Sequence, residues 1–207
     1  MKLAYPMIAA ILFLPLSLHA GKNSGDPGHF QASYDQEAIG HYQEALNALD
    51  ELSAKEGSYV AQLRKGWLHY RLGMNGPAVE AYNKAIVLAP RAVEPRLGVL
   101  LPLLAGKQWQ TAEKHARELL KLDPQNYFGT LRLAFALYNQ NKLVESQRLY
   151  EKLVDAYPSD TDARSGLGWA LLKQGKTAEA AAVFRALLDF APKNALGQQG
   201  IAAANAK

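Results

Sequence analysis

Histidine is the first residue type to examine for chemistry, because its imidazole ring serves as a general base and as a metal ligand near neutral pH. The five histidines are His19, His29, His41, His69 and His115. No two of them show the H-x3-H spacing that places two metal ligands on one helix face. Without a cysteine the chain has no thiol nucleophile, disulfide or Cys-based metal site. Because phosphate-binding glycine loops and the G-x-S-x-G motif are also absent, we expect no enzymatic activity, no metal and no cofactor.

Charge gives no sign of a nucleic-acid partner. The formal net charge is +4 and the pI is near 9.2. Basic residues such as Lys114 and Arg117 alternate with acidic residues such as Glu113 and Glu118. This pattern is typical of a solvated helix face and forms no basic cluster. We therefore expect no nucleic acid as a partner.

The strongest signal in the sequence is a 34-residue period. Prolines recur in one register at Pro90, Pro124, Pro158 and Pro192. A set of small residues keeps the same step, at Ala78, Ala112, Ser146 and Ala180. An apolar set follows it, at Ala85, Leu119, Leu153 and Leu187. This period predicts an all-α solenoid of stacked helix pairs, in which each proline ends the second helix of a pair. The small residue predicts that the two helices of a pair approach closely.

The copies resemble tetratricopeptide repeats, whose pattern includes L-G-x2-Y, then A-x3-F, then P. The last copy carries Leu167-Gly168-x2-Leu171, Ala180-x3-Phe184 and Pro192. Two others carry Ala78-x3-Tyr82 and Ser146-x3-Tyr150. The resemblance covers roughly residues 59–194. It implies a right-handed superhelix of antiparallel helix pairs, which describes a fold and not a function.

Several positions depart from that family pattern. The early tryptophan of the family is replaced in all four copies, by Gln62, Arg96, Thr130 and Arg164. Leu100 and Ala134 stand where glycine is usual, and Ala116 replaces the aromatic residue. The turns between the paired helices are expected at Gly73, Lys107, Asn141 and Gly175. Lys107 does not suit the left-handed conformation of such a turn, although Gly106 is adjacent.

The period divides the chain into a leader, a tail, an array and a last helix. We expect a signal peptide over 1–20, a flexible tail over 21–28 and the array over 29–194. Within the array, the expected repeats are 29–58 (degenerate), 59–92, 93–126, 127–160 and 161–194. A degenerate first repeat is expected because a terminal repeat exposes one face to water. Residues 195–207 predict a capping helix, or else the first helix of an unfinished repeat.

The predicted leader sets the expected location. Lys2 precedes an apolar run from Leu3 to Leu18, and Leu18-His19-Ala20 is a plausible cleavage site. The run has about 16 residues, short of the roughly 20 that a membrane-spanning helix needs. We therefore expect an exported protein, in the periplasm or secreted. The alternative is an uncleaved leader that anchors the chain to the membrane.

The resemblance also implies a binding groove, because the first helices of such repeats line a concave face. The second, fifth, ninth and twelfth positions of each repeat point into it in similar proteins. At the fifth, ninth and twelfth positions we expect an apolar, aromatic-rich groove formed by Leu63, Trp67, Tyr70, Leu97, Leu101, Leu104, Leu131, Phe135, Tyr138, Trp169 and Leu172. An aromatic stripe at helical spacing is also typical of a core. Lys65 and His69 stand at core-like positions, so Trp67 could be a core residue instead.

The sequence therefore predicts a non-catalytic scaffold or adaptor of the bacterial cell envelope that holds a peptide or protein segment in its groove. Acidic C-terminal peptides are disfavoured, since few Lys, Arg or Asn residues stand at groove positions; Arg132 and Asn139 are the nearest. One alternative is self-assembly into a homo-oligomer. Another is carbohydrate contact, as in a polysaccharide-export accessory protein, through rings such as Trp67 and Trp169.

Overall fold

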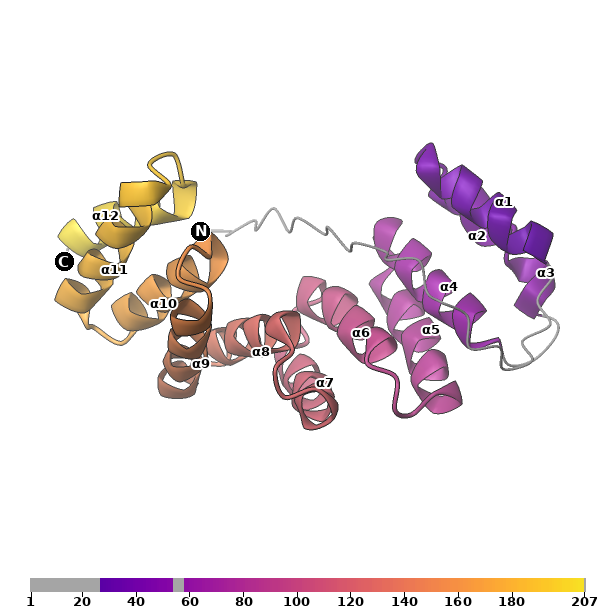
Figure 1. The fold of residues 1–207 in the computed structure, drawn as a ribbon, viewed down its shortest axis with the longest axis horizontal. Coiled ribbons are helices and arrows are strands. Elements are labelled where there is room, and N and C mark those ends of the chain that lie inside the picture. The colour runs from indigo at the N-terminus through magenta and orange to yellow at the C-terminus, as the bar shows by residue number, and fades with distance from the viewer. Residues whose placement is uncertain (1–26, 54–57, 207) are drawn as a thin grey trace.

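The computed structural model describes residues 27–53 and 58–206, and all regular structure in those ranges is helical. The expected leader and most of the expected tail lie outside the described residues. The helices are α1 (Pro27–Ala38), α2 (Tyr42–Asn47), α3 (Asp50–Ser53), α4 (Tyr59–Arg71), α5 (Asn75–Leu88), α6 (Glu94–Ala105), α7 (Trp109–Leu122), α8 (Tyr127–Asn139), α9 (Leu143–Ala156), α10 (Thr161–Lys173), α11 (Thr177–Phe190) and α12 (Ala195–Asn205). They stack into an arch with α1 at one end and α12 at the other (Figure 1). The all-α solenoid expected from the sequence is confirmed.

The arch consists of helix pairs. We call α1, α4, α6, α8, α10 and α12 the A helices, and α2, α5, α7, α9 and α11 the B helices. Each A helix except α12 is followed by its B helix and packs against it. Each B helix also packs against the next A helix, so the stack is continuous from α1 to α12. Of the described helices, none is long and apolar enough to cross a membrane.

The turn from each A helix to its B helix passes through one left-handed residue. These residues are Gly40, Gly73, Lys107, Asn141 and Gly175, with φ between 55° and 81°. A lysine was not expected to suit this conformation, but Lys107 adopts it, with φ 55°, whereas the adjacent Gly106 has φ −79°. The geometry of the turn therefore overrides the preference of a lysine, at a cost of about 1 kcal/mol.

Most A helices begin with a side-chain cap. Asn126 accepts a hydrogen bond from the Gly129 amide at 2.8 Å, and Asp160 accepts one from Ala163 at 2.7 Å. Ser58 and Asn194 cap α4 and α12 in the same way. Such a cap contributes about 1 kcal/mol, because it satisfies an amide that has no partner inside the helix. Capping thus helps to fix where each A helix starts.

The core of the arch lies between the A and B helices. The small residue of each repeat is buried, and Ser146 donates a hydrogen bond from its hydroxyl to the Ala134 carbonyl at 2.8 Å. A buried aromatic ring from α5, α9 or α11 (Tyr82, Tyr150 or Phe184) fills the space beside the next A helix. The array is therefore held by short-range packing between neighbouring helices, as expected for a solenoid.

Candidate functional site

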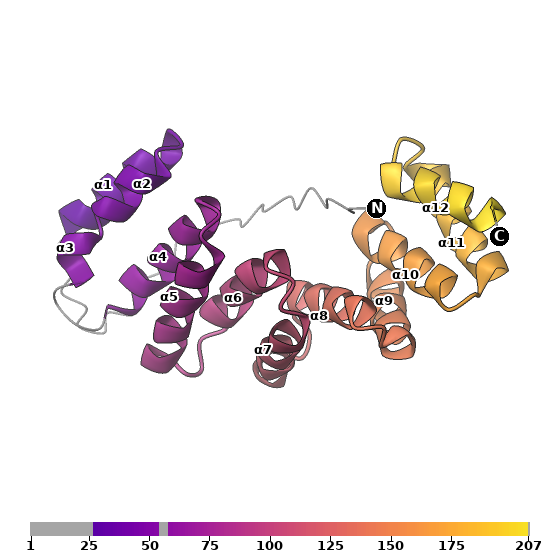
Figure 2. The ribbon, with the colours of Figure 1, turned by 180° about the vertical axis from the view of Figure 1, so that it is seen from behind.

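The A helices line the inner side of the arch. Successive A helices from α4 to α12 contact one another, whereas successive B helices make no comparable contact among the described helices. In a curved stack the elements on the inside are the closest together, so the B helices form the outer side. Two opposite views agree, since both show α7 on the outer edge with α6 and α8 inside (Figures 1 and 2). We call the surface formed by α4, α6, α8 and α10 the inner face.

The eleven residues expected to form the groove all lie on these four helices. Leu101, Leu104 and Leu172 are buried and cannot offer surface to a ligand. Eight are half-buried: Leu63, Trp67, Tyr70, Leu97, Leu131, Phe135, Tyr138 and Trp169. Whether these residues bind a partner stays a prediction.

The half-buried rings are partly occupied by contacts inside the chain. Trp67 donates its indole N–H to Glu37 and lies 6.0 Å from the Tyr70 ring. Phe135 packs edge-on against Trp109 at 5.8 Å, and Trp169 packs against Phe184 at 5.6 Å. These rings therefore serve the packing of the array and are partly accessible to solvent.

Phe128 is a more accessible apolar residue of the inner face than any of the eleven. Its side chain is 43% exposed, and it lies at the second position of its repeat, at the start of α8. The family pattern marks this position as groove-facing, yet sequence reasoning did not select Phe128. Because Phe128 lies beside the half-buried apolar side chains of the inner face, it is a candidate contact for a partner.

Arg132 lies one helical turn after Phe128, on the same side of α8. Its guanidinium is 5.5 Å from the Phe128 ring and donates a hydrogen bond to the Leu97 carbonyl of α6 at 2.8 Å. Burial lowers the pKa of Arg132 to about 10, and nearby Tyr70 and Tyr82 partly offset this effect. No acidic side chain in the described part of the chain forms an ion pair with Arg132. A charge that has lost water and has no counter-ion is unfavourable.

Arg64 stands at the same position of its own repeat but is fully satisfied. Its guanidinium donates hydrogen bonds to the Ser33 hydroxyl at 3.2 and 2.7 Å and to the Glu37 carboxylate at 3.0 Å. It also stacks 3.5 Å from the centre of the Tyr34 ring. All three partners belong to α1, so Arg64 binds α1 to α4 through a buried ion pair.

A packing rule explains why arginine appears at this sixth position of the repeat. Helices α6, α10 and α12 have glycine there, and an aromatic ring from the preceding B helix occupies the space of a side chain: Tyr82 at Gly98, Tyr150 at Gly166 and Phe184 at Gly200. A Cβ atom at these glycines would come within 2.3–2.4 Å of the ring. Before Arg64 and Arg132 the corresponding residues are Leu49 and Ala116. With no ring there, an arginine has room.

The inner helices carry an excess of positive charge. The four helices α4, α6, α8 and α10 hold seven Lys and Arg residues against two acidic ones. The four B helices α5, α7, α9 and α11 hold seven Lys and Arg against eight acidic residues. The charges of these B helices are therefore balanced, whereas the four A helices α4, α6, α8 and α10 carry a positive excess, part of which pairs with α1 and α3 through Arg64 and Lys65.

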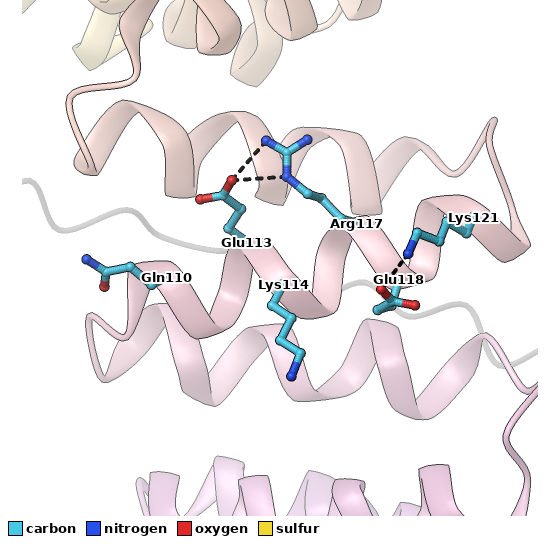
Figure 3. A pocket seen from close by; sticks show the side chains of 6 residues that line it. All are labelled: Gln110, Glu113, Lys114, Arg117, Glu118 and Lys121. Atoms are coloured by element: carbon cyan, nitrogen blue, oxygen red, sulfur yellow. Dashed lines mark hydrogen bonds and ion pairs between the residues drawn. The ribbon is translucent and has the colours of Figure 1, made fainter.

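A shallow hollow lies along α7 on the outer side (Figure 3). It is lined by Gln110, Glu113, Lys114, Arg117, Glu118 and Lys121. Glu113 accepts hydrogen bonds from Arg117 at 2.9 Å, Lys142 at 2.7 Å and Gln140 at 2.7 Å. Although burial raises the pKa of Glu113, these bonds outweigh it and hold the pKa at about 2. Through Glu113, this side of α7 is tied to Gln140 at the end of α8 and to Lys142 at the start of α9.

Two of the departures from the family pattern also serve the array. Arg96 donates a hydrogen bond to the Pro90 carbonyl at 2.9 Å, and Arg164 does the same to the Pro158 carbonyl at 2.6 Å. Each arginine thus joins the start of an A helix to the end of the preceding B helix. Among the described residues, no group of three His, Asp or Glu side chains could hold a metal ion.

Comparison with known proteins gives a family and a fold. A tetratricopeptide repeat model matches residues 30–93 and 131–195, more than half of the chain. No curated protein matches the sequence. MamA from Desulfovibrio magneticus RS-1 is similar in structure, with a TM-score of 0.76, 20% identity and coverage of 81% of this chain and 95% of that one.

Two further solved structures are similar. A tetratricopeptide repeat protein from Parabacteroides merdae has a TM-score of 0.79 and 16% identity, over 86% of this chain and 71% of that one. YrrB, described as a tetratricopeptide repeat protein with an unusual peptide-binding site, has a TM-score of 0.74 and 15% identity, over 84% of this chain and 91% of that one. At these identities the similarity extends to the fold alone.

Proposed function

The chain belongs to the tetratricopeptide repeat family, and on that premise we propose that it is a non-catalytic scaffold whose inner face holds a peptide or protein segment of a partner. Proteins of this family typically mediate protein–protein interactions. The observation that carries the proposal is the exposed Phe128, which continues the half-buried apolar side chains of the inner face. YrrB, which has the same fold, is described as having a peptide-binding site, and this supports a similar use here.

The size of the inner face suits an extended segment or a single helix. Neighbouring helices in a stack lie about 10 Å apart, so the four A helices α4, α6, α8 and α10 span about 30 Å. An extended segment of about 10 residues covers that length. Two or three buried aromatic anchors of about 2–4 kcal/mol each would support binding in the micromolar range, at about 8 kcal/mol.

We propose the cell envelope as the place of action. Support comes from the apolar run that follows Lys2 and ends near Ala20, which has the features of an export signal. Fractionation of cells that express the native chain, with mass measurement of the mature N-terminus, tests this point. A cytoplasmic protein that retains residues 1–20 would contradict it.

The inner-face proposal is tested by site-specific photo-crosslinking in cells. A photoreactive amino acid is placed at Phe128 on the inner face, or at Val144, which is 76% exposed at the start of the outer helix α9. We expect discrete crosslinked products from position 128 and none of the same size from position 144. Products that contain two copies of this chain would favour self-assembly instead. Equal products from both positions would contradict a specific inner-face site.

A further inference from the structure

We infer that the partner segment carries an acidic side chain whose carboxylate pairs with Arg132, within an apolar stretch that covers Phe128. The inference rests on the proposed function, because it gives the chemistry of the ligand for the same inner face. It assigns to Arg132 a role in specificity that follows from its surroundings in this chain.

The hydrogen bonds of Arg132 leave room for such a ligand. A guanidinium has five N–H donors, and the Leu97 carbonyl accepts from one nitrogen, Nη1. In the described part of the chain no carboxylate pairs with it. The planar fork of a guanidinium matches a carboxylate with two parallel hydrogen bonds, which is a strong and directional contact. A ligand carboxylate would therefore supply the counter-ion that the fold does not.

The chain itself shows how an arginine at this position is used when an acidic segment is available. At the equivalent Arg64, helix α1 provides the Glu37 carboxylate, the Ser33 hydroxyl and the Tyr34 ring. Helix α1 contains two acidic residues and no Lys or Arg. Opposite Arg132, the preceding A helix is α6, which lacks an acidic residue after its first turn. Helix α6 therefore offers Arg132 no counterpart of Glu37.

The surroundings of Arg132 also define the kind of acidic segment. Phe128, Leu97 and the tyrosines around the guanidinium are largely apolar, and Arg132 is the only Lys or Arg residue of α8. One guanidinium among apolar groups fits a single Asp or Glu flanked by apolar residues. A run of acids would bury charges without partners. The seven-to-two excess of basic residues on the inner helices disfavours a basic segment.

A displayed library of random 12-residue peptides is the probe, each fused through its carboxyl end so that no free C-terminal carboxylate is presented. Selection is carried out on the wild-type chain, on Arg132→Gln and on a control, Arg185→Gln, which removes an exposed arginine from the outer helix α11. We expect peptides selected on the wild type to share one Asp or Glu between apolar residues. Their affinity should fall at least tenfold on Arg132→Gln and stay unchanged on Arg185→Gln.

Further variants separate the possible results. Circular dichroism tests whether Arg132→Gln folds. Arg132→Lys keeps the positive charge without the planar fork of the guanidinium, so it should bind the selected peptides with intermediate affinity. If peptides bind and are lost in Phe128→Ser but share no acidic residue, or bind Arg132→Gln equally, this inference is overturned while the inner-face proposal stands. If no peptide is selected on the folded wild-type chain, both fail.

Discussion

Arg64 and Arg132 occupy the same position of two repeats, and both have room because no aromatic ring from the preceding B helix fills the space. Arg64 is buried and has a carboxylate, a hydroxyl and an aromatic ring as partners. Arg132 is half-buried and has one backbone carbonyl and, at 5.5 Å, the Phe128 ring. Among the described residues, the same substitution within a repeat thus gives a structural ion pair at one junction and a cation without a carboxylate at the other. The difference depends on which helix precedes each arginine.

The largest expected effect tests the packing rule behind both arginines. Gly166→Arg should lower the free energy of unfolding by about 3 kcal/mol or more, because the Tyr150 ring already lies 2.3 Å from the position of a Cβ atom. Urea denaturation of Gly166→Arg, Tyr150→Ala and the double variant gives the coupling between the two sites. The double variant should lose clearly less than the sum of the single losses. Simple additivity would contradict the rule.

The next effect tests the satisfied arginine. Arg64→Ala should lower the free energy of unfolding by about 2–3 kcal/mol, because it leaves the Ser33 hydroxyl buried and the Glu37 carboxylate partly buried without a cation. Chemical denaturation measures the loss, and hydrogen exchange should show that protection falls first in α1. A loss spread evenly over the array would mean that Arg64 does not specifically bind α1.

A third prediction concerns Glu113, the satisfied carboxylate on the outer side. Its pKa is lowered to about 2, so its bonds stabilise the fold above the unfolded pKa near 4.5. That stabilisation, about 1–2 kcal/mol because Arg117 and Lys142 are partly exposed, should be lost as the pH falls from 4.5 towards 2. Denaturation of the wild type and Glu113→Gln at several pH values measures it. Glu113→Gln should have a lower free energy of unfolding than the wild type at pH 7 and should lose less of it as the pH falls. If the free energies of the two proteins fall in parallel with pH, Glu113 has no such role.

A smaller effect is expected at a turn. Lys107→Gly should raise the free energy of unfolding by about 0.5–1 kcal/mol, since Lys107 has φ 55° and glycine adopts that conformation without strain. Thermal denaturation measures the gain, and Gln108→Gly, at the N-cap of α7 with φ −83°, is a control that should give none. A loss at Lys107 would show that its side chain contributes more than its backbone costs.

The smallest effect is expected for Arg132→Gln, which completes the comparison with Arg64. Removing this cation breaks no ion pair among the described residues, so the free energy of unfolding should change by about 0.5 kcal/mol or less. Urea denaturation beside Arg64→Ala makes the contrast direct. A loss similar to that of Arg64→Ala would place Arg132 among the structural residues.

The sequence was sufficient for the fold because a 34-residue period repeats the same local choices. The small residue, the turn and the proline each recur, so the helices of the four full repeats are each predicted several times over. The candidate site was harder to predict for a physical reason. Which residue fits at the sixth position depends on whether the preceding B helix places an aromatic ring there. Tyr82 does so for the repeat of Gly98, whereas Ala116 leaves room for Arg132. A pattern written for a single repeat does not describe this dependence between neighbouring repeats.

The repeat pattern also fails to predict which residues of the inner face are buried. Leu101 and Leu104 lie at positions that face the groove in similar proteins, but α6 is apolar on nearly all sides after Arg96 and is buried accordingly. Phe128 occupies a position that the family pattern marks as groove-facing, so a search of all four positions would have found it. Only the three-dimensional arrangement shows that Arg132 forms no ion pair with an acidic side chain of residues 27–53 and 58–206.

Helix α12 has a consequence for design. It is capped by Asn194, as α8 and α10 are capped by Asn126 and Asp160, and Gln198 donates to the Pro192 carbonyl as Arg164 does to Pro158. Gly200 lies against the Phe184 ring, as Gly98 of α6 and Gly166 of α10 lie against the rings that precede them. The last helix therefore has the features of a repeat's first half, and further repeats could be appended after it in register. Added repeats would pack on α12 through the same kind of helix–helix contact that already joins neighbouring repeats.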